Sequence, residues 1–147
     1  MNMRQENQKN NLSLIKKIIY AILCVVQILL IVIVNIVSYL SDKKAGVNHH
    51  VYYMRYQYQN GIFSSQNLRI QSVLICLITV ILIFRLIKYK NKFSKFTFIQ
   101  NLIAVFIGLL LLIMINTTLF QGLLAYFYFI MAFEIVFVLQ LLVILLI

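Results

Sequence analysis

One acidic residue, Glu134, lies deep inside a long apolar stretch at the end of this chain of 147 residues. The stretch covers residues 123–147, and Glu134 lies eleven residues after its start, so we expect it near the middle of a membrane-spanning helix. An ionised carboxylate at that depth costs about 2.5 to 3.5 kcal/mol on translocon-based scales and therefore usually faces protein or water. We interpret Glu134 as a candidate proton-relay or ion-coupling residue. The alternative is a protonated acid that only holds two helices together.

Amide and small side chains also interrupt the apolar stretches. Gln27 and Asn35 lie in the first of them, and Asn101, Gly108 and Asn116 share one helical face in the third. Such residues permit close approach of helices and interhelical hydrogen bonds. We interpret all five as packing residues, and Asn101 and Asn116 also as candidate polar support for Glu134.

Other patterns that could carry chemistry are missing from the sequence. Cys24 and Cys76 each lie in an apolar stretch and form no CxxC pair, so we interpret them as packing residues. His49 and His50 are adjacent, which alone does not make a metal site. The sequence contains no nucleophile paired with a base and no phosphate-binding loop. Since ligands for flavin, iron–sulfur clusters or haem are missing too, we expect no cofactor in this chain.

The composition indicates an integral membrane protein. Hydrophobic residues make up 63% of the chain and charged residues 11%, far below the roughly 25% charged of a soluble domain. Four stretches approach or exceed the roughly 20 residues that a helix needs to cross the hydrocarbon layer, namely residues 18–40, 70–87, 98–115 and 123–147. The expected fold is therefore an all-α bundle of about four transmembrane helices.

The connections between these stretches differ in character. Residues 1–17 form a polar N-terminal segment without the features of a signal peptide or an organelle import sequence. Residues 41–69 form a tyrosine-rich connection, expected at headgroup level, with a turn signal at Asn60-Gly61. Residues 117–122 form a short uncharged turn, so we expect the last two helices to pack as an antiparallel hairpin.

Thirteen Lys and Arg residues against three acidic residues give the chain a net charge of +10. Because the bases flank the apolar stretches, they indicate membrane orientation rather than a nucleic-acid partner. A four-span arrangement puts nine bases on the side of the termini and four on the other, which predicts that both termini face the inside. The nine are Arg4, Lys9, Lys16, Lys17, Arg85, Lys88, Lys90, Lys92 and Lys95, and the four are Lys43, Lys44, Arg55 and Arg69.

Several short motifs in residues 69–147 follow one another in a recognisable order. They are a lysine-rich turn, Asn101-Leu102-Ile103, Ile107-Gly108-Leu109, Ala132-Phe133-Glu134 and Leu139-Gln140-Leu141-Leu142. In this order the segment resembles chain 4L of the proton-pumping NADH:ubiquinone oxidoreductase, respiratory complex I. That family has three transmembrane helices, to which residues 70–147 would correspond. Residues 18–40 would then be an additional N-terminal transmembrane helix.

The resemblance implies a subunit of the membrane arm, in contact with other membrane subunits, in which Glu134 contributes a carboxylate to the proton-coupling path. Leu110 stands where the family has a second glutamate, so a relay of two carboxylates within this chain is not expected. The expected location is the mitochondrial inner membrane, or alternatively a bacterial plasma membrane. Two other functions stay open: a stand-alone bacterial membrane protein, such as a proton-coupled transporter or an immunity protein, and a purely structural membrane subunit.

Overall fold

The computed structural model describes the backbone of residues 2–89 and 95–146 and the side chains of residues 18–89 and 95–146. This part of the chain is helical, without strands. The helices are α1 (Asn2–Lys43), α2 (Ala45–Asn60), α3 (Ser65–Tyr89), α4 (Lys95–Asn116), α5 (Thr118–Gln121) and α6 (Tyr126–Leu146).

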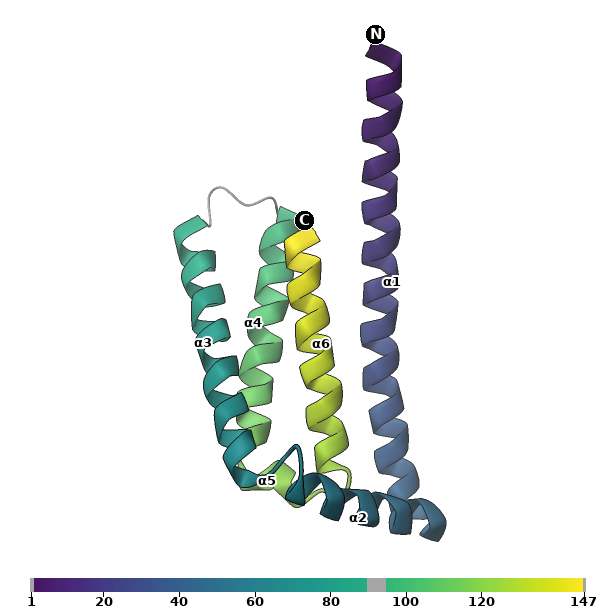
Figure 1. Cartoon of the computed structure of the whole chain (residues 1–147), viewed down its shortest axis with the longest axis vertical. Helices are drawn as coiled ribbons and strands as arrows, with labels where there is room; N and C mark the ends of the chain where they lie inside the picture. The colour runs from purple at the N-terminus through teal and green to yellow at the C-terminus, as the bar shows by residue number, and fades with distance from the viewer. Residues whose placement is uncertain (1, 90–94, 147) are drawn as a thin grey trace.

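Four helical segments of the described chain are long and apolar enough to cross a membrane: Ile18–Lys43 within α1, Ser65–Tyr89, Lys95–Asn116 and Tyr126–Leu146. The predicted all-α bundle of four spans is therefore confirmed. Both termini lie at one end of the bundle, and α2 and α5 lie at the other (Figure 1). Which end faces the inside stays a prediction. Of the bases behind it, Lys90 and Lys92 lie outside the described residues, as do the side chains of Arg4, Lys9, Lys16 and Lys17.

The tyrosine-rich connection contains a helix, α2, which lies across the end of the bundle (Figure 1). Lys44 separates it from α1 because its backbone is extended, with φ −120° and ψ 118°. The side chain of Asn48 then donates a hydrogen bond to the carbonyl of Ser41 over 2.9 Å, which satisfies an acceptor at the end of α1. The predicted turn at Asn60-Gly61 follows directly at the end of α2.

Helix α1 packs along α6. The residues of α1 that are at least half-buried recur every three or four positions, which is the spacing of a helix seam in which side chains interlock. Apart from Asn35, the outward-facing residues between them are exposed and apolar, as a lipid-facing surface requires. The seam consists of Tyr20, Leu23, Cys24, Gln27, Leu30, Ile31, Val34, Val37, Ser38 and Ser41, and Leu40 beside it is half-buried too.

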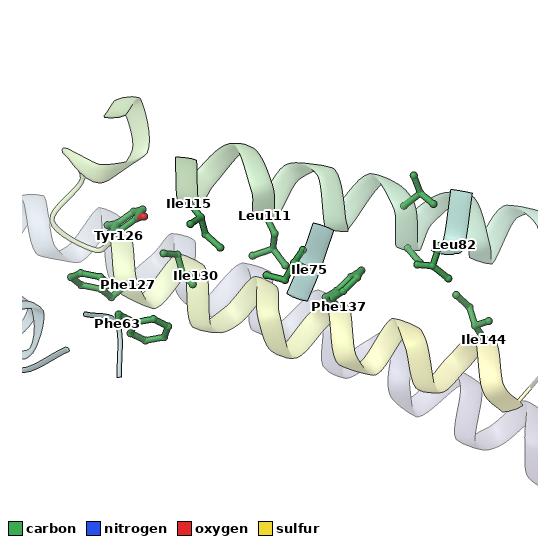
Figure 2. Packing of buried hydrophobic residues seen from close by; sticks show 12 residues of the cluster. Phe63, Ile75, Leu82, Leu111, Ile115, Tyr126, Phe127, Ile130, Phe137 and Ile144 are labelled. Atoms are coloured by element: carbon green, nitrogen blue, oxygen red, sulfur yellow. The ribbon is translucent and has the colours of Figure 1, made fainter. Parts of the chain in front are cut away.

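Helices α3, α4 and α6 form the main apolar core, with α4 in the centre. Figure 2 shows side chains of α4, such as Leu111, pointing toward Ile130 and Phe137 of α6. The three helices approach one another closely at Gly108 of α4, where an added Cβ would collide with the hydroxyl of Thr79 and lie 3.2 Å from the ring of Phe137. The interpretation of Gly108 as a packing residue is thus confirmed.

Replacing Gly108 by leucine is expected to lower the free energy of unfolding by about 1 to 3 kcal/mol, because the new side chain overfills the contact of three helices. The matched control is Gly46→Leu, since Gly46 is also helical but has nothing within 4 Å of its Cβ position. Unfolding of the detergent-solubilised protein, followed by circular dichroism during titration with a denaturing detergent, measures both. Equal stability of the two variants would contradict the close packing at Gly108.

Candidate functional site

Glu134 lies in the central part of α6, eight residues after Tyr126 and twelve before Leu146. This position agrees with the expected depth near the middle of the span. The side chain is half-buried, and no hydrogen bond or ion pair joins it to another residue in the described ranges. Glu134 is therefore partly shielded by this chain, but this chain offers its carboxyl group no partner within the described part.

The described basic residues lie at other depths. Thr79, Gly108 and Phe137 are in contact and define one level across α3, α4 and α6. Helices α3 and α6 run in the same direction. Glu134 lies three residues before Phe137 in α6, and Arg85 lies six residues after Thr79 in α3. Glu134 and Arg85 are therefore roughly 14 Å apart along the helix axis. Arg69 lies about 10 Å from Glu134 along the axis, toward the end of the bundle that carries α2. Both offsets exceed the distance of an ion pair.

The two asparagines considered as polar support for Glu134 have other partners. Asn101 is fully buried, and its side-chain N–H donates to the carbonyl of Thr97 in its own helix over 2.8 Å. Asn116 donates to the hydroxyl of Ser72 in α3 over 3.0 Å and so links two helices. Neither makes a hydrogen bond with Glu134 in the described structure. Leu110 is half-buried in α4.

A cluster of polar side chains, separate from Glu134, joins helices α1, α4 and α6. Gln140 of α6 is 1% exposed, and its amide N–H group donates to the side-chain oxygen of Gln100 of α4 over 2.8 Å and to the Gln100 carbonyl over 3.0 Å. Its side-chain oxygen accepts from Gln27 of α1 over 3.2 Å. Gln100 in turn donates to the hydroxyl of Tyr20 over 2.9 Å. We call these four residues the glutamine cluster.

The glutamine cluster begins and ends on α1, because Gln27 and Tyr20 lie two turns apart on its packed face. The hydrogen bonds therefore connect α1 to both α6 and α4. In an apolar medium, an interhelical hydrogen bond contributes about 0.6 kcal/mol on average and up to about 1.7. Gln140 lies six residues beyond Glu134, roughly 9 Å along the axis, so the cluster is separate from the candidate acid.

Sequence reasoning identified only part of this cluster. Gln27 was interpreted as a packing residue, and its interhelical hydrogen bond confirms this. The same interpretation of Asn35 is wrong within the described chain, because Asn35 is exposed and donates to the carbonyl of Ile31 in its own helix. The roles of Gln100 and Gln140 were missed. The available signal was that each is a strongly polar side chain within an apolar span, where an unpaired amide is costly.

The remaining candidate residues form no site in the described structure. Cys24 lies in the seam of α1, Cys76 is exposed on α3, and both are free thiols. His49 and His50 are exposed on α2, and no metal-binding group of three ligands occurs among the described residues.

Comparison of the chain with protein-family models, curated proteins and solved structures finds no significant match.

Proposed function

We propose that this chain is a small membrane subunit, and that the carboxylate of Glu134 pairs with a basic residue of a partner protein in the same bilayer. The observation that carries the proposal is the position of Glu134: central in a membrane-spanning helix, half-buried, and without a partner in the described chain. Intramembrane acids are rare and mark ion or proton pathways more often than packing sites. A partner that covers the exposed side of Glu134 would both shield and pair it.

The more specific proposal is that the assembly is the membrane arm of a proton-pumping NADH:ubiquinone oxidoreductase. The support is the order of motifs in residues 69–147 and the presence of one acid at mid-span. Helices α3 and α6 both pack against α4, and three is the number of helices that the family resemblance requires; α1 packs against this group through α6. The location proposed on this basis is the mitochondrial inner membrane, with a bacterial plasma membrane as the alternative.

In this proposal the chain itself transfers no electrons. A carboxyl group surrounded by low-dielectric protein responds strongly to a nearby positive charge, because the charge favours its ionised form. Movement of a partner's lysine or arginine toward Glu134 would therefore release a proton, and movement away would take one up. With Leu110 in α4 the chain offers a single acid at this level, so water or the partner must supply the next step of the path.

The first test is purification of the tagged full chain from its native membrane in a mild detergent. Co-migration with a very large assembly that oxidises NADH and reduces ubiquinone is expected. A homogeneous small species would contradict the proposal and favour a stand-alone membrane protein. In that case Glu134 would face a second copy of the chain.

A further inference from the structure

Two adjoining cavities lie at the end of the bundle that carries α2. One has a volume of about 250 Å³ and is lined by residues of α3, α4 and α5, including Arg69, Asn116 and Gln121. The other has a volume of about 240 Å³ and is lined by Arg55, Gln59, Gln121 and Tyr126 among others. Ser65, Leu68 and Gln121 line both. Since one water takes up about 30 Å³ in the liquid, each cavity could hold a group larger than several waters.

The lining is electropositive. Arg55 and Arg69 contribute two guanidinium groups, and none of the described residues that line either cavity is acidic. Arg55 is held in place because it donates to the carbonyls of Gln121 and Leu123, over 2.7 and 2.9 Å. Ser65 and Tyr126 are the first residues of α3 and α6, so the positive ends of two long helix dipoles also lie here. Together these features favour an anion.

A buried donor without a partner lies at the same place. Tyr126 is 3% exposed, and its hydroxyl has no hydrogen-bond partner in the described structure. The side chain of Gln121 contacts this hydroxyl, but the contact does not have the geometry of a hydrogen bond, and the Gln121 amide N–H donates instead to the carbonyl of Ile115 over 3.1 Å. Because burying an unpaired hydroxyl is costly, an acceptor bound in the cavity would stabilise the Tyr126 hydroxyl.

We propose that the joined cavities bind a phosphate ester group, with Arg69, Arg55 and the hydroxyl of Tyr126 as its donors, and that its source is an anionic phospholipid. The cavities lie at the ends of three membrane-spanning helices, where the headgroups of one leaflet are found. Arginine guanidinium groups match phosphate oxygens in geometry as well as in charge. This site is independent of Glu134, which lies about two turns further into the bundle than Tyr126.

The test is native mass spectrometry of the purified full chain in detergent, titrated with phosphatidylglycerol or phosphatidylcholine of equal chain length. We expect preferential binding of phosphatidylglycerol, weakened by about fivefold or more in Arg69→Gln and in Tyr126→Phe. Tyr126→Phe removes only the unpaired hydroxyl, so it should fold as the wild type does. The matched control is Lys88→Gln, which removes one charge at the opposite end of α3 and should bind as the wild type does.

A competition arm distinguishes the source of the phosphate. If inorganic phosphate at millimolar concentration leaves phosphatidylglycerol bound, the lipid is the source. If inorganic phosphate displaces it, the lipid source is overturned and a soluble phosphate compound is indicated instead. Equal binding of phosphatidylglycerol by the wild type, Arg69→Gln and Tyr126→Phe would overturn the site altogether. Circular dichroism of each variant checks that its helix content is unchanged.

Discussion

Under the proposed function, replacing Glu134 by glutamine is expected to leave the chain in its assembly and to lower proton movement and quinone reduction by about tenfold or more. Glutamine has nearly the same shape as glutamic acid but cannot take up or release a proton, and a positioned proton-transfer group contributes about 10² to 10⁴ in rate. Folding should be unaffected because Glu134 makes no hydrogen bond or ion pair within the described chain. Proton uptake per NADH in reconstituted vesicles is the measurement.

Two variants make this result interpretable. Glu134→Asp keeps a titratable group and is expected to keep a substantial part of the activity. Glu134→Leu removes both charge and hydrogen-bonding capacity, so it also reports whether a partner's cation needs this residue for assembly. Normal pumping by Glu134→Gln, in an assembly of normal size, would show that the carboxyl group does not carry protons.

Replacing Gln140 by leucine is expected to loosen α1 from α4 and α6 and to lower the free energy of unfolding by about 2 to 4 kcal/mol. The substitution removes three hydrogen bonds, and it leaves the side chains of Gln27 and Gln100 short of partners in an apolar setting. Denaturing-detergent titration followed by circular dichroism measures the stability. Maleimide labelling of Cys24 in a Cys76→Ser background reports separation of α1 from α6, because Cys24 lies in the seam of α1.

The matched control is Asn35→Leu. Asn35 is also an amide in the membrane-spanning part of α1, but it is exposed and donates to its own helix. Its replacement should change neither the stability nor the labelling rate of Cys24 by a measurable amount. A Gln140→Leu protein as stable as Asn35→Leu would mean that apolar packing alone holds α1 against the bundle.

The membrane-spanning helices were predictable because their signal is local. A run of about 20 apolar residues is enough to predict a span, and α3, α4 and α6 begin and end within about five residues of the expected bounds. Helix α1 covers the first run but begins at Asn2, well before it. Helix α2 was not predicted, since its sixteen residues are largely polar and contain no apolar run. Its position depends on contacts with distant residues instead, such as those between Arg55 and the carbonyls of Gln121 and Leu123.

The candidate site was predictable only in part, for a similar reason. The depth of Glu134 follows from its place in the apolar run, and the structure agrees with it. Which polar residues meet one another does not follow from a single sequence: Gln27 and Gln140 are 113 positions apart, and Gln100 and Tyr20 are 80 apart. Asn116 illustrates the same difficulty, because its spacing placed it on a packing face but could not identify Ser72 as its partner.

The most direct test of the central claim is site-specific photo-cross-linking at Val138 in the native membrane. Val138 is 55% exposed and lies one turn from Glu134 on the same side of α6, so a protein that covers Glu134 must also lie near it. The control position is Ile28, which is 62% exposed on the outer face of α1. The proposal predicts that a photoreactive residue at 138 captures one defined membrane protein, and that the same residue at 28 captures mainly lipid. Lipid adducts alone at position 138 would contradict it.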